Sequence, residues 1–117
     1  MKIVGIGIDV VDIKQFEKIS FESKPWFYKK LFTKSEIRYC LKYKNYYERF
    51  AAKFAIKEAV KKSIHDKIPM IKIETYHLKS KPQVRLNKLK NKYIFHVSLS
   101  HEKDLAVAVV IVEIGSS

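Results

Sequence analysis

The sequence predicts an α+β domain, because helix signals fill its first half and strand signals its last third, with one more strand at the start. Apolar residues alternate along residues 2–11, and residues 46–64 contain good helix formers without glycine or proline. Runs rich in β-branched and aromatic residues then predict strands at 70–78, 83–86, 93–100 and 105–113. The 117 residues, of which 47% are apolar, fit one ordered domain over 1–117.

The first strand is unusual because an acid, Asp9, stands among its apolar residues. One face carries Ile3, Gly5, Gly7, Asp9 and Val11, and it is nearly bare, so another element can approach the backbone closely there. The other face carries Val4, Ile6, Ile8 and Val10 and is predicted to be core. A dinucleotide-binding loop is excluded, since Val10 occupies the third glycine position of G-x-G-x-x-G.

A short helix is expected next. Asp12 is a predicted N-cap, and the helix extends to about residue 19 with Lys14 and Lys18 on its exposed side. Residues 21–32, which include Pro25, are predicted to be irregular.

A second helix begins with a capping-box sequence, "TKSE" at 33–36, and is expected to reach about Tyr43. The long helix follows Asn45, which breaks the pattern, and Pro69 marks the loop after it. Between the last two strands, "HEKD" at 101–104 is predicted to be a tight turn.

The charge narrows the possible partners. The chain has 24 Lys and Arg against 12 Asp and Glu, a net charge of +12, which favours an anionic partner: nucleic acid, an acidic protein or a phosphate-rich ligand. A merely soluble, lysine-rich surface explains the same composition. The single cysteine, Cys40, suits a buried, inert thiol in a reducing cytoplasm. The longest apolar run, 105–112, is too short to span a bilayer, so no membrane association is expected.

Two carboxylates are candidates for a metal site. Glu58 lies on a small-residue face of the long helix, where its simplest partner is Lys62, one turn further along. Asp9 lies on the glycine face of the first strand, and glycine packed against alanine would bring Asp9 and Glu58 together. Two such carboxylates favour a cation between them. Magnesium is usually held by few protein ligands, which leaves coordination sites for phosphate oxygens. The lysines of the helix would then attract a polyphosphate: Lys53, Lys57, Lys61 and Lys62.

These elements resemble holo-acyl-carrier-protein synthase, the short class of 4′-phosphopantetheinyl transferases. The motifs that carry the resemblance are "GIDVVDI" at 7–13, "KFAIKEAVKK" at 53–62, "SKP" at 80–82 and "SLSHEKDLAVAVV" at 98–110. The resemblance covers nearly the whole chain. It implies a mostly antiparallel sheet wrapped around a long helix, and a homotrimer with active sites at the subunit interfaces.

The resemblance also implies a reaction, the transfer of phosphopantetheine from coenzyme A to a serine of apo acyl carrier protein, with release of adenosine 3′,5′-bisphosphate. Asp9 and Glu58 would bind Mg²⁺, and Glu58 or a water bound to the metal would be the general base. The implied CoA-binding residues are Lys53, Phe54, Lys57, Lys62, Pro82 and His101, the last from a neighbouring subunit. Lys14 and Lys18 match the carrier-docking surface.

Some positions depart from the family pattern. Lys53 stands where arginine is usual, which weakens a bidentate phosphate contact, and Ser80 replaces a turn glycine. "SIHDKIP" at 63–69 replaces a glycine-containing stretch. Two alternatives remain: a small basic nucleic-acid-binding module, which leaves Asp9 and Glu58 unexplained, and a family member that binds CoA without transferring it.

Overall fold

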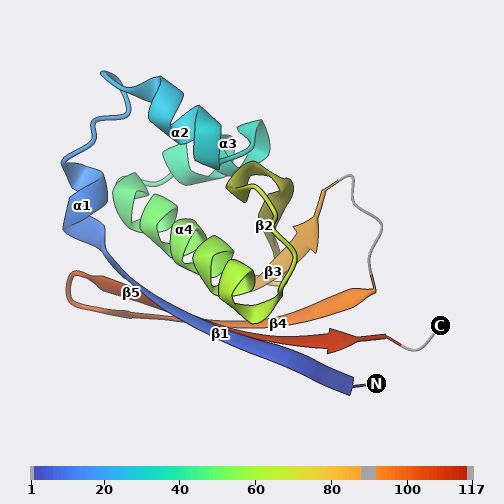
Figure 1. Cartoon of the computed structure of the whole chain (residues 1–117). Helices are drawn as coiled ribbons and strands as arrows, with labels where there is room; N and C mark the ends of the chain where they lie inside the picture. Colours follow the sequence, from blue (N-terminus) through green and yellow to red (C-terminus); the bar gives the residue numbers. More distant parts are fainter. Residues whose placement is uncertain (1, 88–91, 116–117) are drawn as a thin grey trace.

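The computed structural model describes residues 2–87 and 92–115 and has an α+β architecture (Figure 1). Three antiparallel strands form one sheet in the order β1-β5-β4: β1 (Lys2–Asp12), β5 (Leu105–Ile114) and β4 (Tyr93–Glu102). A separate antiparallel hairpin contains β2 (Ile73–Leu78) and β3 (Lys81–Leu86). The helices are α1 (Ile13–Glu17), α2 (Pro25–Leu31), α3 (Lys34–Leu41), α4 (Tyr46–Ser63) and the 3₁₀ turn η1 (Met70–Lys72). The predicted fold class and the antiparallel pairing are confirmed.

Helix α4 lies on the sheet at very short range, and the two glycines of β1 make this possible. A Cβ atom at Gly7 would lie 1.9 Å from the carbonyl oxygen of Ala59, and one at Gly5 would lie 1.8 Å from that of Ser63. Any side chain at these positions would overlap the helix backbone. The predicted close approach to the glycine face is therefore confirmed, and it fixes the position of β1 against α4.

The opposite face of β1 is exposed, which contradicts the prediction that it forms core. Ile6, Ile8 and Val10 are 66%, 56% and 55% exposed, and Val4 is also exposed. The reason is visible in Figure 1: all helices lie on the same side of the three-stranded sheet. Alternation along a strand tells which residues share a face, but not which face is covered within one chain.

Residues 21–32 are more regular than predicted, because α2 begins at Pro25 within this segment. Proline suits the first turn of a helix, where its missing N–H costs no hydrogen bond. The aromatic side chains bury α2 against α4: Tyr28 is fully buried and its ring lies 4.6 Å from that of Phe50. The Tyr28 hydroxyl donates to the carbonyl of Ile19 over 2.6 Å. Tertiary packing thus stabilises a helix too short to be stable alone.

Helix boundaries agree with the capping predictions at their starts and differ at their ends. The side chain of Asp12 accepts from the backbone N–H of Lys14, and Thr33 and Glu36 form the reciprocal capping box. Helices α1 and α3 end at Glu17 and Leu41, each two residues before the predicted end.

Two tight turns use left-handed backbone conformations. Lys79 and Ser80 connect β2 to β3 with φ angles of 50° and 68°. Lys103 has a φ of 54° in the β4–β5 turn, where the strands extend to Glu102 and resume at Leu105, so the turn is shorter than the predicted 101–104. Ser80 therefore holds the conformation that a glycine would adopt most easily. None of the helices in the described part of the chain is both long and apolar enough to cross a membrane.

Candidate active site

Asp9 and Glu58 line one groove, as the sequence predicted from the glycine and alanine faces. Strand β1 supplies Asp9, and α4 supplies Glu58 and Phe54. We call this space the carboxylate groove; it has a volume of about 430 Å³, and its other lining residues are Val10, Val11, Asp12, Gln15, Phe16, Ile19 and Phe27. The two acids therefore share a mostly apolar groove that is open to solvent.

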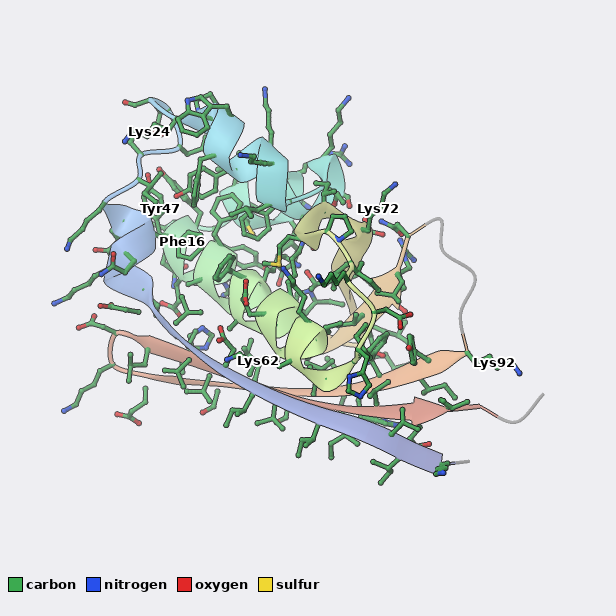
Figure 2. All side chains as sticks on the ribbon, viewed as in Figure 1. Phe16, Lys24, Tyr47, Lys62, Lys72 and Lys92 are labelled. Carbon is green, nitrogen blue, oxygen red and sulfur yellow. The ribbon has the colours of Figure 1, made fainter. Side chains whose placement is uncertain are left out.

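Lys62 neutralises Asp9 in this groove. Its side chain extends from α4 toward β1 (Figure 2), and its Nζ donates to Asp9 Oδ1 over 2.9 Å and to the carbonyl oxygen of Ile8 over 3.0 Å. The Asp9 side chain is only 14% exposed, so this ion pair is partly shielded from water. Within the described ranges, the ion pair formed by Lys62 is with Asp9, and the simple helix pair of Glu58 with Lys62 is not observed.

The groove has the donor chemistry of a hard-cation site. Asp12 in its lining caps α1, whereas Asp9 and Glu58 come from facing elements. An ammonium group already lies against Asp9, so a positive charge is favourable at this position. In residues 2–87 and 92–115, no group of three or more His, Cys, Asp or Glu side chains is placed to hold a metal. Two oxygen-donor side chains with space beside them suit Mg²⁺, which keeps several waters or phosphate oxygens as ligands.

A second cavity lies beside a different face of α4, and it brings together three of the other predicted residues. Lys53, Pro82 and His101 line it together with Arg49 and His77, while Tyr39, Ala52, Ile56, Thr75, Tyr76 and Leu99 complete it. We call it the cationic cavity. Its volume is about 40 Å³. From the sequence, Arg49 could have been recognised only as the residue one helical turn before Lys53, and Tyr39 and His77 gave no signal.

Lys53 is held inside the protein. Its Nζ donates to Thr75 Oγ1 over 2.8 Å and lies 4.7 Å from the centre of the Tyr39 ring. Desolvation by burial lowers the pKa of Lys53, and the nearby Cys40 and Glu36 oppose this effect. The Lys53 ammonium therefore adds positive charge beside the cavity, although its 2.8 Å hydrogen bond is already formed with Thr75.

Lys57 lies in the core and lines neither space, although the sequence pointed to a ligand-facing lysine. Its Nζ donates to Glu36 Oε1 over 2.7 Å and to the carbonyl oxygens of Leu31 and Met70. Both side chains of the ion pair are fully buried. Glu36 also accepts from the backbone N–H of Thr75. This network joins α3, α4 and β2, so the observed position of Lys57 is structural.

Of the two lysines predicted to dock the carrier, Lys14 lies on α1 and Lys18 directly follows this helix, which lies beside the carboxylate groove. Both are exposed, and Lys14 forms an ion pair of 3.3 Å with Asp104. Gln15 and Phe16 of the same helix line the groove. A partner that contacts α1 would therefore sit next to the two acids.

Comparison with known proteins identifies the family. A family model described as the 4′-phosphopantetheinyl transferase superfamily matches residues 5–110. A holo-[acyl-carrier-protein] synthase of Syntrophus aciditrophicus is 39% identical over 124 residues, which cover 93% of this chain and 94% of that protein. The chain belongs to the holo-acyl-carrier-protein synthase family. It is thus a transferase of the short class. A synthase of Ehrlichia chaffeensis is 34% identical, with 93% and 95% of the two chains covered.

Solved structures of this family share the fold. The Thermotoga maritima synthase superposes with a TM-score of 0.79 at 32% identity, over 97% of this chain and 65% of that chain. The Bacillus anthracis synthase in complex with CoA (3′,5′-ADP) gives a TM-score of 0.74 at 31% identity, over 98% and 100% of the two chains. These two synthases therefore share the overall fold of this chain.

Proposed function

We propose that this protein transfers the 4′-phosphopantetheine group of CoA to a serine of an apo acyl carrier protein and releases adenosine 3′,5′-bisphosphate. The observation that carries the proposal is the pair Asp9 and Glu58, which share one groove between β1 and α4 in a chain of the synthase family. The Bacillus anthracis relative solved in complex with CoA supports CoA as the donor. A nucleic-acid-binding module would not require this pair of carboxylates.

In this mechanism, Asp9 and Glu58 are the residues that would hold Mg²⁺, and the bound metal would neutralise charge on the CoA pyrophosphate. Glu58 accepts the proton of the carrier serine, directly or through a water. The serine oxygen forms a bond to the phosphorus that carries pantetheine, and the phosphoanhydride bond to the nucleotide breaks. The leaving phosphate keeps the bonding electrons. Lys62, which lies 2.9 Å from Asp9 and is about half exposed, would supply a positive charge for the CoA phosphates beside this site.

We include a homotrimer with interfacial active sites in the proposal. Two observations support it. The apolar outer face of β1 is exposed in a single chain and would be buried by another copy. Apart from the buried Lys57, the predicted CoA-binding residues also fall into two groups. Phe54 and Lys62 lie at the carboxylate groove, and Lys53, Pro82 and His101 line the cationic cavity. A site built from the groove of one copy and the cavity of the next would unite them.

The acidic carrier is proposed to dock on α1 and the residue after it through the exposed side chains of Lys14 and Lys18, since Gln15 and Phe16 of the same helix line the groove. Charge complementarity of this kind raises the association rate more than the affinity. We expect the variant Lys14→Glu/Lys18→Glu to raise KM for the carrier more than KM for CoA. The matched control, Lys34→Glu/Lys42→Glu, removes the same charge from the exposed side of α3. Equal changes in both KM values would reject the docking assignment.

The decisive experiment is the transfer assay. The protein, Mg²⁺, CoA and apo carrier are incubated, and the carrier mass is measured for the gain of one phosphopantetheine. Asp9→Asn and Glu58→Gln should each abolish transfer while the chain remains folded, and Glu22→Gln, a change at an exposed acid that lines neither space, should not abolish it. Near-normal turnover in either variant would remove that residue from the metal site. CoA binding without transfer by the wild type would indicate a binding protein, and salt-sensitive RNA or DNA binding in its place would favour the nucleic-acid alternative.

A further inference from the structure

A further groove lies between α2, α3 and η1, on the far side of α4 from the three-stranded sheet (Figure 1). We call it the outer groove. Its volume is about 720 Å³, larger than that of the carboxylate groove and within the range of about 300–1,000 Å³ that is usual for ligand-binding clefts. Its apolar lining residues are Phe32, Ile37, Leu41 and Ile71. Leu41 is 41% exposed, so the groove presents apolar surface to water, and an apolar surface with a polar rim is typical of an interaction site.

The charged side chains that line the outer groove are all positive. They are Lys29 of α2 and Lys34 and Arg38 of α3, and all three are exposed. Within residues 2–87 and 92–115, none of the three forms an ion pair, and the lining of the groove contains no acidic side chain. An apolar surface bordered by three unpaired cations is complementary to an apolar surface bordered by acids.

The acids that contact the lining of the outer groove are already paired inside the protein. Thr33 lines the groove, donates from Oγ1 to Glu74 and donates from its backbone N–H to Glu36. Glu74 forms an ion pair of 2.7 Å with Arg85, and Glu36 forms one of 2.7 Å with Lys57. Neither carboxylate therefore neutralises the cations of the groove, so their counter-charge has to come from outside this part of the chain.

The residues that α3 contributes have the spacing of a helix-binding surface. They stand at positions i, i+3, i+4 and i+7 and form one stripe along the helix: Lys34, Ile37, Arg38 and Leu41. A second helix that lies along this stripe would place apolar side chains against Ile37 and Leu41. Acidic side chains on its flank would then meet Lys34 and Arg38. This is the pattern of an amphipathic helix bound in a groove.

The shape of the outer groove favours a helix over a lipid surface. Phe32 is only 1% exposed, and Ile37 and Ile71 are half-buried, so the apolar surface is recessed rather than protruding. A protein that inserts into a bilayer presents its apolar side chains outward, beyond its cations. The occupant of the outer groove instead has to bring apolar side chains into the protein.

We propose that the outer groove binds an acidic amphipathic helix of a partner protein other than the acyl carrier that docks on α1. This inference goes beyond the proposed function and does not rest on it. Both grooves use α2, since Phe27 lines the carboxylate groove and Lys29 lines the outer groove. Residues two apart in a helix point to nearly opposite sides, so a helix in the outer groove leaves the carrier surface free.

The probe is a synthetic peptide that repeats the heptad Glu-Leu-Leu-Glu-Glu-Leu-Ala and forms a helix with one apolar and one acidic side. One control peptide replaces every Glu by Lys, which reverses the charge and keeps the apolar side. The other replaces every Leu by Ser, which keeps the charge and removes the apolar side. Dissociation constants are measured by fluorescence anisotropy with the whole chain at physiological salt. We expect the acidic amphipathic peptide to bind at least about 10-fold more tightly than either control.

Variants of the groove show where the peptide binds. Lys29→Gln/Arg38→Gln should weaken binding by roughly 3- to 10-fold, the effect of losing two exposed ion pairs. Leu41→Ser should weaken it by roughly 10-fold through lost apolar contact. The matched control is Lys30→Gln/Lys42→Gln, which removes the same charge from exposed residues of α2 and of the position after α3 that do not line the groove. It should change the constant by less than about twofold.

Four results would overturn the proposal. They are no preference of the wild type for the acidic amphipathic peptide, equal losses in the Lys29→Gln/Arg38→Gln variant and its matched control, binding of phosphatidylglycerol vesicles in place of the peptide, and a higher KM for the carrier in Lys29→Gln/Arg38→Gln. The last would assign the groove to carrier docking. If Leu41→Ser fails to fold, Lys29→Gln/Arg38→Gln decides alone, because it changes exposed side chains only. A wild type that binds the peptide but transfers no phosphopantetheine refutes the proposed function and supports the groove.

Discussion

Replacing Gly7 by alanine tests the close packing of β1 on α4. The added Cβ would lie 1.9 Å from the carbonyl oxygen of Ala59, 2.9 Å from its carbon and 3.1 Å from the nitrogen of Ser63. All three atoms belong to the helix backbone, so no side-chain rotation can relieve the overlap. Because ordinary contact begins at 3.4 Å, strand and helix would have to separate by about 1.5 Å (3.4 minus 1.9).

The expected cost follows from this separation. Inserting one methyl group into a packed core costs about 1–3 kcal/mol when neighbours can adjust, and this site lies at or above the upper limit because the neighbours are backbone. We therefore expect Gly7→Ala to lower the free energy of unfolding by at least about 3 kcal/mol. For a chain of this size that corresponds to roughly 10–15 °C in melting temperature.

The assay is thermal and urea unfolding at equal protein concentration, together with the transfer assay. Asp9 is two residues further along β1, so a displaced strand also lengthens the 2.9 Å contact from Lys62 and lowers transfer at temperatures where the variant is folded. Gly115→Ala is the control, since its Cβ would meet the Ile94 side chain at an ordinary 3.4 Å. A Gly7→Ala melting temperature within 2 °C of wild type, with normal transfer, would refute the packing argument.

Three further predictions concern stability and reactivity. Lys57→Met leaves the Glu36 carboxylate buried without its cation and should lower the free energy of unfolding in urea by about 3–5 kcal/mol. The double variant Glu36→Gln/Lys57→Met should lose less than the sum of the two single variants, and additive losses would argue against a coupled pair. Ser80→Gly should raise the free energy of unfolding by about 0.5–1 kcal/mol, because glycine relieves the left-handed backbone at φ 68°, and a destabilised variant would contradict this. Burial raises the pKa of Cys40 to about 12, so a thiol reagent at pH 8 should not label the folded protein but should label one thiol per chain in guanidinium.

The parts of the fold that depend on neighbouring residues in the sequence could be predicted. The capping box at Thr33 and the N-cap at Asp12 are local hydrogen-bond patterns, and both are confirmed. Glycines that alternate along a strand indicated where α4 would approach β1, which brought Asp9 and Glu58 to one groove. Helix α2 was missed because Pro25 was interpreted as a loop signal, although the first turn of a helix tolerates proline.

The parts that depend on distant residues could not be predicted. Lys57 resembles its exposed neighbours in the sequence, and only the position of Glu36 on α3 explains its burial. Arg49 stands one helical turn before Lys53 in the sequence, but its position over Tyr43 and beside the β2–β3 hairpin depends on distant residues. The exposed side of β1 could not be recognised either, since exposure depends on how many layers cover a sheet.

Substitutions on the two faces of β1 should have different effects on the protein. Odd-numbered positions such as Gly5 and Gly7 meet the helix of their own chain, whereas the even-numbered positions Ile6 and Ile8 face outward. In a saturation scan of β1, polar substitutions at the helix-facing positions Gly5, Gly7 and Val11 should remove the folded chain itself. The same substitutions at Ile6 and Ile8 should leave a folded chain that no longer forms the trimer proposed above. Loss of folding and loss of assembly would then alternate from one residue to the next along β1, so mutagenesis alone would distinguish the two effects.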